Sequence, residues 1–292
     1  ARLTPLGLQL LRADQRMQAR LTPTLMTLAA ELETEINQTL EGGRTTRLRL
    51  HASHGFAIAC LREALERRRD SRWELQFRST MDALAALFQR NCEVAAIHVP
   101  CVDHSGRDPH TLKQQALAAW EPWLSPEQRV IPFVRRCQGL MLPPGNPAGI
   151  RGLEDLAETR LRFVNRQSGS GSRALFDALL SRARVASRDL RGYQHEEFTH
   201  AAVAAFVASG MADVGFGIEA AARQFDLGFI PLVDEHYSLI CWADFLDSEP
   251  AAGLLEQLGD RRFGAVIDAI PGYRWVCDGT ARPLASAFPA DP

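Results

Sequence analysis

Hydrophobic residues recur at intervals of three and four positions along the opening segment of the chain. They are Leu11, Met17, Leu21, Leu25, Leu28, Leu32, Ile36 and Leu40, with polar residues between them. This spacing predicts one long amphipathic helix over Leu8–Leu40, which Pro23 is expected to kink or break and which Gly42 and Gly43 end. A helix of this length cannot bury its apolar stripe alone, so we expect it to pack against a second copy of the chain or against the domain that follows.

After Gly43 the pattern changes to short β-prone runs that alternate with helical segments. The β-prone runs are Arg47–Ser53, Trp73–Ser79 and Val94–Val99, and the helical segments are Phe56–Arg67 and Met81–Gln89. This alternation predicts a parallel sheet with helices on its faces. Ligands of such sheets bind beyond the carboxyl ends of the strands, where Ser53, His54, Ser79 and Thr80 are expected. Ser53 and either Ser79 or Thr80 are also candidate caps of the helices that follow.

A second alternating region begins beyond about residue 136. It contains extended runs, predicted helices and a helix start at Thr199. Two extended runs flank residue 136, Val130–Val134 and Gly139–Pro147. Further along, a strand is expected over Phe229–Trp242 and helical structure over Leu254–Ile270. Before these runs, a helix is expected near Leu112–Trp120. The chain is therefore expected to hold two αβ modules whose helix starts face a common cleft.

The most informative stretch of the second module is Leu161–Leu180, which reads as strand, loop and helix. Its loop consists of Ser168, Gly169, Ser170, Gly171 and Ser172 and leads into Arg173. Glycines let backbone N–H groups turn toward one point, serines add hydroxyl donors, and the helix start adds the positive end of its dipole. The loop therefore suits a small anion, with a plain flexible connection as the alternative. Arg173 adds either a charge-assisted ligand contact or a structural ion pair.

Composition describes an ordinary protein with one unusual bias. The chain has 292 residues, a net charge of -2 and 46% hydrophobic residues, and Lys113 is its single lysine. The charge balance provides no global attraction to nucleic acid or membrane. We find no export signal and no apolar stretch long enough to span a bilayer, and the six scattered cysteines suit a reducing compartment, so a cytoplasmic location is expected.

Three other kinds of site are considered: a dinucleotide site, a zinc site and a catalytic serine. Gly169 to Ala174 matches GxGxxA, but no acidic strand end follows at the distance that a dinucleotide site needs. His98, Cys101, His104 and His110 are close in sequence, yet they lack the paired spacing of a zinc site and are read as core or surface residues. No serine lies in a G-x-S-x-G elbow, so no enzyme is predicted. No cofactor and no metal are expected.

Two segments carry a resemblance to a known family. They are RFVNRQSGSGSRALFDALL and the run from THAAVAAFVASGMADVG to the strand GFIPL. They resemble the periplasmic-binding-protein-like effector domain of helix-turn-helix regulators, including LysR-type and molybdate-responsive ones. The opening LTPLGLQLLRADQRM resembles the linker helix that follows the winged DNA-binding head of a LysR-type regulator, a head that this chain does not include.

The resemblance implies an α/β fold of the type 2 periplasmic-binding-protein class, with two αβ lobes and two crossover strands behind a long linker helix. It places the linker and oligomerisation helix at 1–43, lobe I at 44–136 with 237–292, and lobe II at 137–236. The effector would bind between the lobes and change the geometry of a homo-oligomer on DNA.

The resemblance also assigns candidate ligand contacts by position. They are Ser53, His54, Ser79, Thr80, His98, Ser168, Gly169, Ser170, Gly171, Ser172, Arg173, Thr199 and His200. Molybdate, tungstate, sulfate, formate or another small carboxylate would suit such a site. The expected partners are this effector, further copies of the chain, and DNA through a winged helix-turn-helix. A transport-type binding protein for molybdate, tungstate or a related oxyanion is the alternative, and a catalytic αβ protein is a third.

Overall fold

The computed structural model describes residues 3–41, 48–68, 73–158 and 161–287. The chain divides into two compact units. Unit 1 comprises 1–25, 103–107 and 137–234, and unit 2 comprises 26–102, 108–136 and 235–292. The helix α1 (Pro5–Glu41) and the long strands β4 (Gln128–Leu142) and β8 (Gly228–Trp242) each contribute residues to both units, so each unit is built from segments that are distant in sequence.

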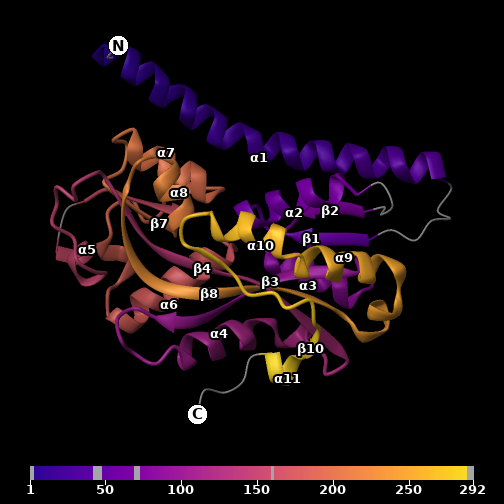
Figure 1. The fold of residues 1–292 in the computed structure, drawn as a ribbon. Helices are drawn as coiled ribbons and strands as arrows, with labels where there is room; N and C mark the ends of the chain where they lie inside the picture. Colours follow the sequence, from indigo (N-terminus) through magenta and orange to yellow (C-terminus); the bar gives the residue numbers. More distant parts are fainter. Residues whose placement is uncertain (1–2, 42–47, 69–72, 159–160, 288–292) are drawn as a thin grey trace. The chain divides into compact units, whose positions relative to one another are not determined.

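The opening segment forms one helix, α1 (Pro5–Glu41), which Figure 1 shows without interruption. The expected break at Pro23 is wrong, because the helix continues through this residue. Gly42 and Gly43, expected to end the helix, lie outside the described residues. Most of the predicted apolar stripe is exposed, and its larger side chains range from 43% exposed at Leu11 to 62% at Leu25.

Unit 2 contains the predicted parallel sheet. Its strands are β1 (Leu48–Ala52), β2 (Trp73–Phe77) and β3 (Val94–Asp103), and its helices are α2 (Phe56–Glu66), α3 (Thr80–Phe88), α4 (His110–Trp120), α9 (Glu249–Gly259), α10 (Arg261–Asp268) and α11 (Leu284–Ala287). β1 pairs in parallel with both β2 and β3. Leu84, Leu87, Ile97 and Val130 pack into the core of this unit, where each buried aliphatic side chain contributes about 1.5–3 kcal/mol.

The two crossover segments are each a single strand. β4 (Gln128–Leu142) joins the two runs that were expected to be separate, and β8 is Gly228–Trp242. In unit 2, β9 (Tyr273–Trp275) and β10 (Arg282–Pro283) pair antiparallel to β4. Arg135, Arg136 and Gln138 interrupt the apolar pattern although they are strand residues, and Arg136 pairs with the buried carboxylate of Glu235.

Unit 1 contains the second αβ module. Its strands are β5 (Phe163–Arg166), β6 (Glu196–Glu197) and β7 (Val214–Ile218), and its helices are α5 (Glu154–Glu158), α6 (Gly171–Ala183), α7 (His200–Ala208) and α8 (Glu219–Gln224). β5 pairs in parallel with β6 and β7, while β7 pairs antiparallel to β4. Phe163, Phe176 and Phe216 stack in its core, with ring centroids 4.8 and 5.0 Å apart.

Close backbone packing in unit 1 depends on Gly139 of β4. A Cβ atom added at this position would lie 2.0 Å from the carbonyl oxygen of Ile230 in β8. Only glycine permits this approach. None of the described helices is both long and apolar enough to span a membrane.

Candidate functional site

Ser53 follows β1 in unit 2 and faces a buried histidine. Its hydroxyl lies 3.1 Å from Nε2 of His98, a β3 residue. The expectation that Ser53 caps α2 is wrong, because Gly55 holds the N-cap position and no side chain in the described part of unit 2 caps this helix. The first backbone N–H groups of α2 therefore lack a side-chain acceptor.

Arg136 of β4 connects His98 to a buried carboxylate. Its Nε donates to Oε1 of Glu235 at 2.5 Å, and its Nη2 lies 3.1 Å from Nδ1 of His98. A guanidinium can only donate, so Nδ1 accepts, and this assigns the ring proton to Nε2. Nε2 then donates to the oxygen of Ser53, which leaves the hydroxyl proton of Ser53 to donate to a further acceptor.

Two tyrosines complete this group, which we call the arginine cluster: Ser53, His98, Arg136, Glu235, Tyr237 and Tyr273. Nη1 of Arg136 and both tyrosine hydroxyls are buried, and none of them meets the geometric criterion for a hydrogen bond among the described residues. Ser53 still lies close enough to Tyr237, and Arg136 close enough to Tyr273, to lower the pKa of each phenol by hydrogen bonding. Burial raises the pKa of both phenols, and Arg136 opposes part of that rise. Both tyrosines therefore stay protonated and remain potential donors near neutral pH.

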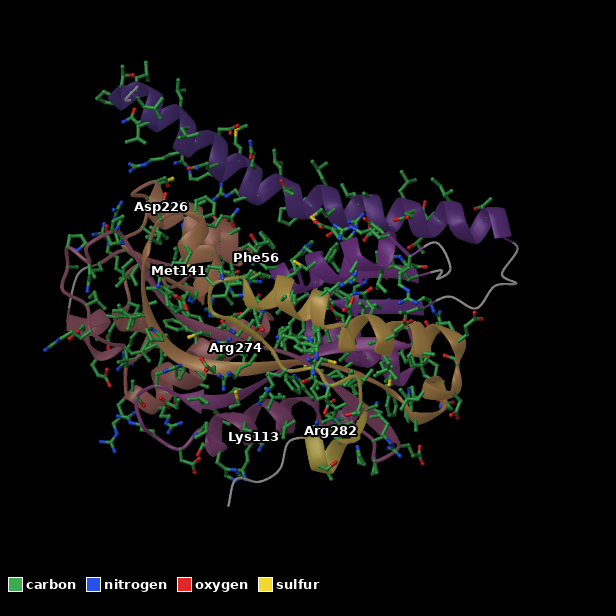
Figure 2. All side chains as sticks on the ribbon, viewed as in Figure 1. Phe56, Lys113, Met141, Asp226, Arg274 and Arg282 are labelled. Atoms are coloured by element: carbon green, nitrogen blue, oxygen red, sulfur yellow. The ribbon has the colours of Figure 1, made fainter. Side chains whose placement is uncertain are left out.

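Nη1 of Arg136 faces the beginning of α2. It lies 3.6 Å from the position that a Cβ atom would take at Gly55, next to Phe56, the first helical residue, which Figure 2 labels. The first turn of α2 has the sequence Phe-Ala-Ile-Ala and so contains no acid. A guanidinium and the positive end of a helix dipole repel each other unless an anion lies between them. This arrangement can therefore bind a small anion.

The other predicted contacts of unit 2 lie elsewhere. Ser79 caps α3 by accepting from the backbone N–H of Asp82 at 3.2 Å, and its hydroxyl donates to the carboxylate of Asp82 at 2.7 Å. Thr80 is the first, buried residue of the same helix. The ring of His54 stacks on Phe77 with centroids 3.8 Å apart, and its Nε2 lies 3.1 Å from Oγ1 of Thr27 in α1. Of the five residues predicted in this unit, the arginine cluster brings together Ser53 and His98.

In unit 1 the predicted Ser/Gly loop forms a turn and a cap. Ser168 and Gly169 are exposed turn residues, and Gly169 has a φ of 81°, which favours glycine. Ser170 caps α6 by accepting from the backbone N–H of Arg173 at 3.2 Å. Gly171 is the first residue of the helix. The first turn of α6 has the sequence Gly-Ser-Arg-Ala and so contains no acid.

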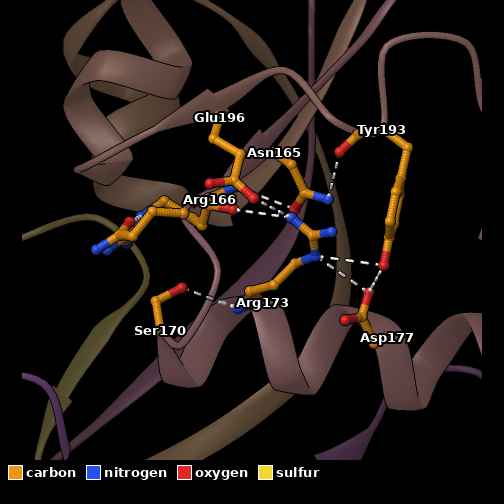
Figure 3. Close-up of polar contacts among 8 residues, drawn as sticks. Asn165, Arg166, Ser170, Arg173, Asp177, Tyr193 and Glu196 are labelled. Carbon is orange, nitrogen blue, oxygen red and sulfur yellow. Dashed lines mark hydrogen bonds and ion pairs between the residues drawn. The ribbon is translucent and has the colours of Figure 1, made fainter.

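The guanidinium of Arg173 is directed away from the helix start, as Figure 3 shows. Its Nη1 donates to Glu196 at 3.1 Å and to the carbonyl of Arg166 at 3.2 Å. Its Nε lies 3.3 Å from both Asp177 and the hydroxyl of Tyr193. Of the two roles considered for Arg173, this geometry is that of a structural ion pair, which holds α6 against β5 and β6.

The start of α7 meets the start of α6. Thr199 caps α7 by accepting from the backbone N–H of Ala202 at 3.0 Å. His200, the first residue of α7, is buried and places Nε2 3.3 Å from the hydroxyl of Ser172. Two helix starts without first-turn acids thus lie together in unit 1. Their combined dipoles favour negative charge there.

Sequence reasoning missed four residues of the arginine cluster: Arg136, Glu235, Tyr237 and Tyr273. They come from β4, β8 and β9 and share no local motif. Opposite charges in the middle of two β-prone runs were the available signal, because a charge inside a buried strand needs a partner.

Comparison with known proteins identifies the family of the chain. A family model for the PBP superfamily domain matches residues 62–259. An uncharacterized protein of Bacillus subtilis (strain 168), YvgK, is 32% identical over 165 residues, which cover 56% of this chain and 51% of that protein. The chain thus matches about half the length of this relative.

Two solved structures illustrate the shared fold. A phosphate ABC transporter substrate-binding protein from Clostridium perfringens, described as putative and solved with bound phosphate, has a TM-score of 0.56 at 10% identity, covering 79% of this chain and 100% of that one. The regulatory domain of MetR, a LysR family regulator from N. meningitidis, has a TM-score of 0.53 at 11% identity, covering 79% and 98%. The fold prediction is confirmed, and since the family model matches more than half of its residues, the chain belongs to the PBP superfamily domain family.

Proposed function

We propose that this chain is the effector-binding domain of a bacterial LysR-type transcriptional regulator, and that its effector is a small anion. The family, the fold shared with regulatory domains such as that of MetR, and the long amphipathic α1 support this proposal. DNA would be bound by a winged helix-turn-helix outside the described residues, in the cytoplasm. The chain would act by binding rather than by catalysis.

One observation carries the ligand class. Nη1 of Arg136 is buried, has no partner within hydrogen-bond geometry among the described residues, and faces the start of α2. Burying a guanidinium donor without an acceptor costs free energy that a bound anion would recover. Ser53 stands beside it with a hydroxyl proton to donate.

The chemistry of the arginine cluster favours a fully deprotonated anion. Nη1 of Arg136 and the first backbone N–H groups of α2 can only donate, so an acidic O–H of the ligand would find no acceptor among them. Molybdate, tungstate, sulfate, formate and other small carboxylates are fully ionised at neutral pH. Hydrogen phosphate carries a proton and is expected to bind more weakly.

Calorimetric titration of the purified chain tests this proposal. We expect at least one of molybdate, tungstate, sulfate and formate to bind with one site per chain, more tightly than inorganic phosphate. Tightest binding of phosphate would contradict the argument from ligand protonation. Absence of binding to all five anions would overturn the anion-binding function.

We propose further that α1 forms the contact between copies of the chain. Met17, Leu21, Leu25, Leu28, Leu32 and Ile36 follow one another at steps of four, four, three, four and four residues and are each 48–62% exposed. Such a seam is typical of helices that pair along their length. The helix continues across Pro23, so the exposed apolar residues on both sides of Pro23 belong to one helix.

A pair of double variants tests this interface. Leu21→Glu with Leu28→Glu places charges in the seam and is expected to reduce the mass measured by light scattering to that of one chain. Thr22→Glu with Ala29→Glu adds the same charge at the same spacing on exposed positions beside the seam. The control should keep the oligomer, and an oligomer that survives in both variants would exclude α1 as the principal contact.

A transport-type binding protein for an oxyanion is the second candidate, because the phosphate-binding structure shares the fold over 79% of this chain. Both candidates use the same anion chemistry. The gene region upstream of Ala1 separates them. A winged helix-turn-helix in frame supports the regulator, and an export signal supports the transporter.

A further inference from the structure

Three metal-ligating side chains converge in unit 1, outside the residues assigned above. They are His104, Cys137 of β4 and Asp234 of β8. Nε2 of His104 lies 2.9 Å from Oδ1 of Asp234 and 3.9 Å from Sγ of Cys137, and all three ligand atoms lie within 4.8 Å of one another. Among the described residues, this is the group in which three metal-ligating atoms of His, Cys, Asp or Glu side chains lie this close together.

The directions of these contacts distinguish a metal site from a catalytic relay. In a nucleophile–histidine–acid triad the nucleophile and the acid contact different ring nitrogens. Here the thiol and the carboxylate both approach Nε2 of His104. Atoms that surround one point, instead of forming a chain, are arranged as ligands of a single ion.

The spacing suits an ion of the size and preference of zinc. Zinc binds imidazole nitrogen, thiolate sulfur and carboxylate oxygen at about 2.0–2.3 Å, which places tetrahedral ligand atoms about 3.3–3.6 Å apart. The observed separations of 2.9 and 3.9 Å bracket this range. The third separation, from the thiol to the carboxylate, is at most 4.8 Å, so ligand movements of up to about an ångström would complete the site. A thiolate ligand disfavours calcium and magnesium.

The backbone already holds the three ligands in place. The N–H of His104 donates to the carbonyl of Leu232 in β8 at 2.9 Å. The preceding residue, Asp103, is buried and lies 3.2 Å from Nη1 of Arg182 of α6. Two ligands therefore come from long strands and the third from a segment held by contacts at Asp103 and at His104 itself, which reduces the entropy that metal binding must overcome.

We propose that His104, Cys137 and Asp234 bind one zinc ion or a similar transition-metal ion, with a fourth position open to water. Binding releases the thiol proton, and the proton on Nε2 of His104 moves to Nδ1. The ion would connect segments that are 33 and 130 residues apart in sequence. Because closing long loops restricts the unfolded chain, the bound ion would stabilise unit 1.

Cobalt substitution of the purified full chain tests the site directly. Adding Co²⁺ in stoichiometric amounts is expected to produce a thiolate-to-cobalt charge-transfer band and the visible bands of a tetrahedral ion. Adding Zn²⁺ should displace the Co²⁺ and so remove both sets of bands. Zn²⁺ at 100-fold excess over its dissociation constant should also raise the Tm of the chain by about 5 °C or more.

Variants decide whether the three residues are responsible. Cys137→Ser should abolish the charge-transfer band, and Asp234→Asn, which keeps the shape of the side chain, should weaken Co²⁺ binding at least about tenfold. Cys60→Ser removes a half-buried thiol of unit 2 and should change neither. An unchanged band in Cys137→Ser, or equal Co²⁺ affinity in wild type and Asp234→Asn, would overturn the proposal.

Discussion

The starts of α2 and α3 have the same local sequence signal but different structures. Each follows a strand of the parallel sheet in unit 2, and each has a serine within three residues of its first turn. At α3, Ser79 caps the helix and Asp82 places a carboxylate in the first turn. At α2, Ser53 turns to His98, and Arg136 faces an uncapped first turn.

This difference separates a helix start that is already neutralised from one that can accept a ligand. The carboxylate of Asp82 stabilises the positive end of α3 and would repel a second anion. The start of α2 has a buried cation where α3 has an acid. A serine near a helix start is therefore weak evidence for a ligand site, and the charge brought to that start by distant strands is the informative feature.

The strongest test gives the start of α2 a carboxylate, as the start of α3 already has. Gly55→Asp would supply a carboxylate cap that also reaches Nη1 of Arg136, since the position has an extended backbone and room for a Cβ atom. We expect anion affinity to fall about 1000-fold, because like charges placed together cost several kcal/mol. The free energy of unfolding should rise by about 0.5 kcal/mol, because glycine is already a fair N-cap residue and the carboxylate adds a favourable charge at the helix start.

Gly55→Ala is the matched control, because it adds the Cβ atom without the charge. It should reduce affinity far less than Gly55→Asp in calorimetric titration. If both variants bind the anion as wild type does, the start of α2 is not part of the site.

Removing the cation should have the next largest effect. Arg136→Gln combined with Glu235→Gln removes both buried charges together, which avoids leaving either one unpaired. Affinity for the anion is expected to fall about 100-fold, since a charged hydrogen bond contributes about 1.5–3 kcal/mol.

The control for this pair is Arg162→Gln with Asp213→Asn, a bonded ion pair of unit 1. It should leave anion binding unchanged. Equal losses in the two double variants, measured on chains with native circular dichroism, would show that neither effect is specific to the arginine cluster.

The smallest effect is expected from replacing either of the two serines, Ser53 or Ser79, with alanine. Ser53→Ala removes one neutral donor and should lower anion affinity about tenfold while the Tm changes little. Ser79→Ala removes a cap and should lower the free energy of unfolding by about 1 kcal/mol without changing affinity. Reversed outcomes would assign the ligand to α3 and would contradict the distinction drawn above.

Much of the fold was predictable because its elements are locally encoded. The apolar spacing of α1, the three strands of unit 2, and the caps at Ser79, Ser170 and Thr199 all follow from patterns within a few residues. The continuity of β4 was missed because Arg135–Gln138 interrupts the apolar pattern. Sequence alone does not show that Arg136 pairs with the buried carboxylate of Glu235, which lies 99 residues later in the chain.

The candidate site was predictable only in outline. The positions of Ser53 and His98 follow from strand ends, but their joint role depends on Arg136 and Glu235, which enter from two other strands. Arg173 looked suited to a ligand, yet its partners Asp177, Tyr193 and Glu196 became evident only in three dimensions.

Neighbouring residues of β4 and β8 serve two different groups. Arg136 pairs with Glu235, while Cys137 and Asp234 both approach His104. The side chains of successive strand residues point to opposite faces of the strand, so Arg136 and Cys137 point to opposite faces of β4, and Asp234 and Glu235 to opposite faces of β8. Inserting or deleting a single residue next to either position would exchange the two faces. Homologues that retain both groups should therefore tolerate length changes in the surrounding loops but show none within these two strands.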